Sequence, residues 1–176
     1  MFDSIKYGIA TFLVKKKLKH KLQDRQSFKN FFKSSGRFLI LMPENESHFY
    51  YALEILKFFE LSGKSFSIFT HDYRVSMLPP KYHEAAIDFG VYEITRLNLP
   101  SAKLAKKLHK LEFSAVLDLN KEESLFNSLA ANMVKADVRA GFTKNNSDFF
   151  YNLQVSNSDN NPDIFYKNFL NCLQMF

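Results

Sequence analysis

Five consecutive apolar residues ended by a proline decide the fold: Phe38-Leu39-Ile40-Leu41-Met42-Pro43. An unbroken apolar run is typical of a strand buried on both faces, which is the environment inside a parallel sheet. Residues 45–62 then carry apolar side chains at helical intervals, and Gly63 supplies a stop signal. A buried strand followed directly by an amphipathic helix predicts the first unit of an α/β fold.

The same alternation continues to the end of the chain. Further strands are predicted at Ser65–Thr70, across Ala86–Phe89 and Val91–Ile94 as one or two short pieces, at Phe113–Leu119, at Val138–Phe142 and at Tyr151–Val155. Helical segments are predicted at His71–Met77, from Pro100-Ser101 to Leu111, at Glu122–Lys135 and at Pro162–Met175. Residues 37–176 are therefore predicted to form one α/β domain, with a Rossmann-like parallel sheet and crossover helices.

Residues 1–36 differ in composition and are predicted to be a basic, amphipathic helical arm. Residues 1–37 hold ten lysines and arginines and two aspartates, so the overall charge of +6 comes from a segment of +8 and a remainder of −2. One face of the arm carries Phe2, Ile5, Ile9, Phe12 and Leu13. Val14, Leu18 and Leu22 continue on roughly the opposite side. The arm could thus present two different apolar faces.

A basic amphipathic segment is typical of contact with an anionic surface. The residues predicted to touch a membrane or another polyanion are Phe2, Ile5, Ile9, Phe12, Lys15, Lys16, Lys17, Lys19 and Lys21. Packing of the arm on its own domain or on a twin chain is an equal alternative, and RNA or ribosome contact is a third. No run approaches the about 20 apolar residues of a spanning helix. With Cys172 as the only cysteine, we expect a cytoplasmic protein, peripheral on the inner face of the membrane.

Polar side chains follow the predicted strands, at the edge where open α/β sheets bind ligands. The predicted ligand contacts are Asn45, Ser47, His48, His71, Asp72, Arg74, Asp118, Asn120 and Lys144. Asp72 and Arg74 suit either a substrate clamp or a local ion pair, of which the ion pair is favoured. Asp118 at a strand end also suits a cap for the next helix.

Glu44 and Glu46 lie at the first strand-to-helix turn, where a general base is expected in many enzymes of this architecture. First-turn acids that complement a helix dipole are the favoured interpretation. The sequence contains no G-x-G-x-x-G or G-x-x-x-x-G-K-[ST] pattern, and no cofactor is predicted. No histidine pair has the spacing of a helical metal site, and no metal is predicted.

Two segments carry a family resemblance. Phe113-Ser-Ala-Val-Leu-Asp-Leu-Asn120 is similar to a strand reading Y-D-L-V-L-D-L in the heptosyltransferase family, glycosyltransferase family nine. Val138-Arg-Ala-Gly-Phe142 and Phe150-Tyr-Asn-Leu-Gln-Val155 resemble that family's R-I-G-F … Y-N-L-x-V stretch. Residues 37–176 thus resemble the N-terminal, acceptor-side half of these enzymes.

The chain departs from the family pattern in two ways. The family's first strand is followed by R-x-D-x-x-G-D, whose first aspartate is thought to deprotonate the acceptor sugar, whereas this chain has Met42-Pro-Glu-Asn-Glu-Ser-His48. The 176 residues also do not include the family's second, donor-binding lobe, so we expect sugar transfer to require a partner chain. Glu44 and Glu46 would be substitutes for the lost aspartate only by conjecture.

The leading hypothesis is a non-catalytic, glycosyltransferase-like binding or scaffolding module held at the cytoplasmic membrane face by its arm. A glycosyltransferase subunit that needs a donor-binding partner is the enzyme alternative, and an RNA- or ribosome-associated protein is the third. The partners expected are an anionic membrane surface or a lipid-linked saccharide, and a protein partner or a second copy of the chain. Nucleic acid is disfavoured, because the basic charge is confined to the arm.

Overall fold

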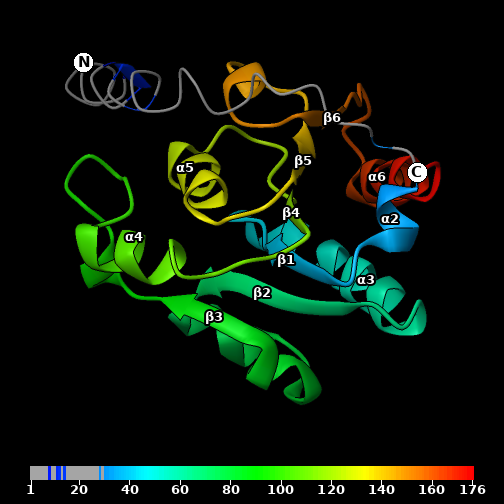
Figure 1. The fold of residues 1–176 in the computed structure, drawn as a ribbon, viewed down its shortest axis with the longest axis horizontal. Coiled ribbons are helices and arrows are strands. Elements are labelled where there is room, and N and C mark those ends of the chain that lie inside the picture. The colour runs from blue at the N-terminus through cyan, green and yellow to red at the C-terminus, as the bar shows by residue number, and fades with distance from the viewer. Residues whose placement is uncertain (1–7, 9–10, 13, 15–27, 29) are drawn as a thin grey trace.

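Strand β1 (Arg37–Leu41) lies at the centre of a six-stranded sheet in which all neighbours pair in parallel (Figure 1). The other strands are β2 (Ser65–His71), β3 (Ala86–Phe89), β4 (Ala115–Asp118), β5 (Val138–Phe142) and β6 (Leu153–Val155). The computed structural model describes residues 8, 11, 12, 14, 28 and 30–176. The strand order β3-β2-β1-β4-β5-β6 confirms the predicted Rossmann-like α/β fold.

Helices cover both faces of the sheet. They are α2 (Phe31–Ser34), α3 (Glu46–Leu61), α4 (Ala102–Leu108), α5 (Leu125–Met133) and α6 (Pro162–Gln174). Successive β1 side chains alternate between the two faces, so Phe38 and Ile40 pack with α3 and α6, while Leu39 and Leu41 pack with α4 and α5. This division explains why β1 is apolar at consecutive positions: neither of its faces meets water.

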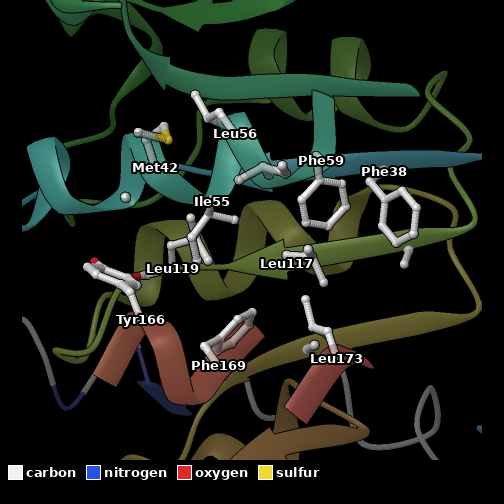
Figure 2. Close-up of a cluster of buried hydrophobic side chains, with 14 of the residues drawn as sticks. Phe38, Met42, Ile55, Leu56, Phe59, Leu117, Leu119, Tyr166, Phe169 and Leu173 are labelled. Atoms are coloured by element: carbon white, nitrogen blue, oxygen red, sulfur yellow. The ribbon is translucent and has the colours of Figure 1, made fainter. Parts of the chain in front are cut away.

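The larger apolar cluster lies between the sheet and helices α3 and α6. Figure 2 shows Phe59 of α3 beside Phe38 of β1, with Phe169 and Leu173 of α6 facing the same space. The ring centroids of Phe38 and Phe59 are 4.9 Å apart and meet edge to face, a favoured geometry for aromatic pairs. The many phenylalanines of the sequence therefore fill this core.

The first helix after β1 begins and ends where the sequence predicts. Asn45 Oδ1 accepts a hydrogen bond from the backbone N–H of His48 at 3.3 Å and caps α3. Gly63 follows the helix with a φ of 63°, a left-handed conformation that glycine adopts without strain. The cap at Asn45 therefore fixes the chain where it leaves β1, at the polar edge of the sheet.

The structure decides between one and two strands around Gly90, and it shortens a predicted helix. Of the one or two strands expected around Gly90 only β3 forms, because Val91–Glu93 closes a 3₁₀ turn in which the Glu93 carboxylate accepts from the Gly90 N–H at 3.1 Å. The helix expected from Glu122 begins only at Leu125, because Ser124 Oγ accepts from the Asn127 N–H at 3.2 Å. Residues 121–124 instead run along the polar edge of the sheet.

The last turn of the arm belongs to the domain core, since Phe31 and Phe32 of α2 are buried in the larger cluster. Farther back, Val14 is 1% exposed and packs in the cluster under α4 and α5, whereas Phe12 is 69% exposed. The other predicted membrane contacts, residues 2, 5, 9, 15–17, 19 and 21, lie outside the described residues. No helix in the described part of the chain is long and apolar enough to span a membrane.

Candidate functional site

The carboxyl ends of β1, β2, β4 and β5 bring most of the predicted polar residues to one edge of the sheet. The strand order reverses between β1 and β4, because β1 continues into α3 on one face and β4 leads to α5 on the other. Such a switch point is where open α/β sheets bind ligands. Leu41 of β1 is in register with Asp118 of β4 and with Phe69 of β2, so the loops that follow these strands start at one level.

Asp118 is fully buried at this switch point and is held from three sides. Its carboxylate accepts hydrogen bonds from Asn120, through the backbone N–H at 3.0 Å and Nδ2 at 2.7 Å. Lys144 Nζ lies 3.0 Å from Oδ2, and the Tyr151 hydroxyl donates to the same oxygen. Asp118 therefore does not cap α5, a role that Ser124 fills, but joins the end of β4 to the loop after β5.

The same cluster fixes the protonation of its tyrosine. Burial, and next the negative charge of Asp118, raise the pKa of Tyr151 well above its ordinary value. Tyr151 thus remains a neutral hydrogen-bond donor under all ordinary conditions. Lys144 also donates to the backbone oxygen of Asn120 at 2.8 Å, so the predicted ligand contacts Asp118, Asn120 and Lys144 hold one another inside the protein.

Glu44 is held on both its backbone and its side chain. Its N–H donates to Asn120 Oδ1 at 2.8 Å, and its carboxylate accepts from Ser124 Oγ at 2.6 Å and Asn127 Nδ2 at 2.7 Å. The carboxylate therefore complements the N-terminus of α5, on the far side of the switch point, whereas Glu46 lies exposed in the first turn of α3. Of the two predicted acids, only Glu44 belongs to the edge.

Asp72 and Arg74 do not form the ion pair that the sequence favours. Asp72 Oδ1 accepts from the Tyr73 N–H at 2.7 Å and lies 2.5 Å from His71 Nδ1. Arg74 instead donates to the carbonyl oxygens of Pro43, at 2.8 Å, and Glu44. The 3₁₀ turn Asp72–Met77 causes this divergence, because residues two apart in such a turn point in different directions.

His71 lies between the turn and the end of β3. Its ring centroid is 4.4 Å from that of Tyr73 and 5.1 Å from that of Phe89. Although Nδ1 is close to Asp72, the two atoms are not aligned for a hydrogen bond, and this buried nitrogen has no aligned partner among the described residues. His71 is therefore placed by ring packing more than by hydrogen bonding.

A pocket of about 230 Å³ opens at the carboxyl ends of β1, β2 and β3. Its apolar wall consists of Met42, Pro43, Phe69, Phe89, Ile94 and Phe126. Its polar wall consists of Glu44, Thr70, His71, Tyr73, Arg74, Asn98 and Asn127. Aromatic rings pack on one another across the floor, with centroid distances of 4.7 Å for both the stacked pair Phe69–Phe89 and the tilted pair Phe89–Phe126. This mixture of a rigid apolar floor and a few polar groups is typical of small-molecule sites.

A second, narrow pocket of about 40 Å³ lies on the other side of Glu44. It is lined by Pro43, Glu44, Asn45, His48 and residues 120–124. Burial lowers the pKa of His48, while Glu122 opposes this effect, so the imidazole is neutral at physiological pH. Ser47 hydrogen-bonds to Asn45 at the exposed start of α3 and lines neither pocket. Of the predicted contacts, His71 and Arg74 line the wider pocket and Asn45, His48 and Asn120 the narrow one, whereas Ser47, Asp72, Asp118 and Lys144 line neither.

The sequence model of DUF6913, described as a family of unknown function, matches residues 11–176. The chain belongs to this family. The match includes both pockets, the buried cluster around Asp118 and the part of the arm from Thr11 onward. No curated protein and no solved structure matches the chain.

Four residues in the polar wall of the DUF6913 pocket are not predicted from the sequence: Thr70, Tyr73, Asn98 and Asn127. Asn127 comes from α5, more than 80 residues after Glu44 in the chain, as does Phe126 of the apolar wall. Tyr73 lies in the 3₁₀ turn after β2, and Asn98 lies in a loop. Asn98 has a φ of 55°, which asparagine tolerates better than most residues, so the Asn-Leu-Pro turn was a usable signal. The contribution of α5 depends on the strand order, which no local sequence pattern predicts.

Proposed function

We propose that this DUF6913 chain is a non-catalytic, glycosyltransferase-like binding module that holds a small polar ligand in the pocket at the carboxyl ends of β1, β2 and β3. The observation that carries the proposal is the pocket itself, in which Arg74, His71 and Asn98 face an aromatic floor. Its volume of about 230 Å³ is below the range of about 300–1,000 Å³ of sites for drug-sized molecules. A ligand the size of one sugar ring suits it.

The hydrogen bonds at the switch point support a binding role over a catalytic one. In the glycosyltransferase resemblance, a carboxylate after the first strand removes a proton from the acceptor. Glu44 follows the corresponding strand here, but its carboxylate already accepts from Ser124 and Asn127. Both bonds end on the same carboxylate oxygen and hold the group toward the start of α5, which makes a fixed structural role the better match for this geometry.

The chemistry of the pocket supports a ligand that is both ring-shaped and polar. The closely packed rings of Phe69, Phe89 and Phe126 give the pocket an apolar base against which the C–H face of a sugar ring can pack. Asn98 is exposed at the rim, and no hydrogen bond engages its side-chain amide within the described residues. Such a group is available for a ligand hydroxyl.

Thermal unfolding with and without ligands tests this proposal. We expect at least one member of a panel of monosaccharides, uronic acids and monosaccharide phosphates to raise the melting temperature. Ile94→Phe, which adds volume to the pocket wall, should abolish the shift, whereas Leu97→Phe in the same loop, outside the lining, should retain it. The proposal fails if no compound of the panel raises the melting temperature of the unaltered chain.

A specific observation also favours a membrane surface as the place where the module works. Val14 is buried on the domain while Phe12 is 69% exposed, so the Phe12 side chain is directed away from the core. In the sequence, Phe2, Ile5 and Ile9 share the predicted face of Phe12 and lysines follow it. Each juxtamembrane lysine contributes about 1 kcal/mol of attraction to anionic lipid, and apolar side chains add interfacial burial.

Flotation on vesicles tests the membrane role. The unaltered chain should float with vesicles containing phosphatidylglycerol and remain behind with pure phosphatidylcholine vesicles. Phe12→Asp should float poorly, while Tyr92→Asp, at a site 99% exposed on the domain, should float normally. Equal flotation of the two variants would show that Phe12 and its arm do not contact the membrane. Competition by RNA for the bound chain would show instead that the arm prefers nucleic acid.

A further inference from the structure

The charge of Arg74 is not balanced by any carboxylate of the residues that the structure describes. Its side chain lines the pocket and the residue is 9% exposed. Guanidinium groups stay protonated in proteins, and buried charges are usually paired. Among the described residues, no aspartate or glutamate oxygen lies within ion-pair distance of Arg74, since Asp72 is directed to His71 and the Glu44 carboxylate to α5.

The partners of Arg74 position its charge without neutralising it. Nη1 and Nη2 each donate to a carbonyl oxygen of the loop after β1, those of Pro43 and Glu44, and Nε donates to the Tyr73 hydroxyl at 2.9 Å. The guanidinium also lies over the rings of Phe49 and Tyr73, at 5.5 Å from each centroid. Three of its five N–H groups are engaged in these bonds, so two remain for a ligand.

Arg139 provides an internal comparison. It is equally buried, and its guanidinium donates to the carbonyl oxygens of Ala131, Val134 and Ala136 at the end of α5. The C-terminus of a helix is the negative end of its dipole, so this arginine is compensated by the fold. Arg74 lies instead beside the start of α3, which is the positive end of a helix dipole. The dipole of α3 therefore does not compensate the positive charge of Arg74.

Other hydrogen-bond donors line the same pocket. The Tyr73 hydroxyl accepts from Arg74 and retains its own hydrogen, and the amide of Asn98 is exposed at the rim. His71 also lines the pocket, and its buried Nδ1 has no aligned hydrogen-bond partner within the described part of the chain. The wall around Arg74 thus offers one uncompensated cation together with the donors of Tyr73 and Asn98.

We infer that the pocket takes an anionic ligand, a small molecule whose carboxylate or phosphate group binds Arg74 beside Tyr73 and His71 while its ring packs on the aromatic floor. This inference rests on the proposed binding function and specifies its ligand class. Arginine suits both groups, because its planar donors match the oxygens of a carboxylate or a phosphate. The Glu44 carboxylate, turned to α5, also lines the pocket and can accept from ligand hydroxyls.

Calorimetry with three probes tests the inference: glucose, glucuronate and glucose 6-phosphate. We expect at least one of the two anions to bind the full chain about tenfold or more tightly than glucose. Equal binding of glucose and the anions would overturn the anionic class and leave the binding function standing. Binding of neither glucose nor the anions would overturn both.

Two variants separate charge from folding. Arg74→Gln should lose the preference for the anion, but it also removes bonds to the loop after β1 and so needs a companion that leaves the fold intact. Asn98→Asp places a carboxylate at the exposed rim in a left-handed conformation that aspartate tolerates, and should weaken anion binding several-fold. Asn30→Asp, with the same conformation outside the pocket, should not. Unchanged anion affinity in Asn98→Asp would contradict the inference.

Discussion

Lys144 Nζ lies 3.0 Å from Asp118 Oδ2, and the two side chains are only 6% and 0% exposed. The pair joins the end of β4 to the loop that follows β5. The carboxylate gains further hydrogen bonds from Asn120 and Tyr151, so that its desolvation is offset by four donors. This buried cluster, directly behind the two pockets, keeps the edge of the sheet in one arrangement.

Replacement of Lys144 by methionine should destabilise the protein strongly. The change leaves the Asp118 carboxylate buried without its cation, a situation that typically costs about 3–5 kcal/mol. The double variant Asp118→Asn with Lys144→Met should recover part of the loss, since the isolated charge is then absent. Denaturant unfolding of the two single variants and the double variant measures the coupling. Additive losses would show that the two side chains act independently.

An exposed ion pair provides the control for this experiment. Lys167 and Asp163 are 2.7 Å apart and face solvent on α6. Exposed pairs of this kind contribute little to stability, because water already solvates both charges. Lys167→Met should therefore unfold close to the unaltered protein. A loss as large as that of Lys144→Met would mean that burial is not the cause.

Gly141 of β5 should not tolerate alanine. A Cβ at this position would lie 3.1 Å from two carbon atoms of the Tyr151 ring, which cannot move away easily because its hydroxyl is held by Asp118 and Ser128. Such overpacking typically costs about 1–3 kcal/mol. Gly36→Ala is the control, since a Cβ there meets no atom within 4 Å. Equal thermal stability of the two variants would contradict this account of the close approach.

The fold could be predicted because its signals are local. The apolar run at β1, the cap at Asn45 and the stop at Gly63 lie within one segment, and each acts through neighbouring residues. Reliance on local signals also explains why the sequence predicts the start of α5 three residues too early. Glu122 and Glu123 are good first-turn residues, but Ser124 forms the cap and the segment before it is held in the edge network.

The candidate site could be predicted only in part, because its contacts cross the sheet. Strand ends indicate that Glu44, His71 and Arg74 lie at one edge. They do not indicate that Arg74 reaches back to the loop after β1, or that Asn127 from α5 binds the Glu44 carboxylate. Those contacts depend on which strands are neighbours and on the curvature of one 3₁₀ turn, neither of which is encoded in a local pattern.

Tyr166 should make the stability depend on pH in the alkaline range. Its hydroxyl donates to the Leu119 carbonyl oxygen at 2.9 Å, and burial, followed by the charges of Asp118 and Glu122, raises its pKa in the folded state. Below pH about 10, the ordinary tyrosine pKa, both states are protonated and the contribution is fully present. Above that pH only the unfolded chain ionises this group, so the free energy of unfolding decreases.

Tyr166→Phe isolates this effect. At neutral pH the variant should lose about 0.5–1.5 kcal/mol with the hydrogen bond, and above pH about 10 its stability should fall less steeply than that of the unaltered chain. Urea unfolding at a series of pH values measures both quantities. Parallel stability curves for the two proteins throughout the alkaline range would show that Tyr166 ionises equally in both states.

Phe32 links the arm to the core, and its replacement by alanine should destabilise the domain even though the sequence predicts a boundary at residues 36–37. Its ring lies 5.7 Å from that of Phe38 and 5.5 Å from that of Phe59, measured between centroids, and it is buried beneath α3. Loss of a buried phenylalanine typically costs about 3–5 kcal/mol, because a cavity remains where the ring was.

Phe12→Ala, at an exposed position of the same arm, removes a ring of the same size without opening a cavity and should leave the free energy of unfolding nearly unchanged. Denaturant unfolding of both variants therefore locates the true start of the folded unit. If Phe32→Ala were as stable as Phe12→Ala, α2 would not contribute to the stability of the domain, and the domain would begin at β1.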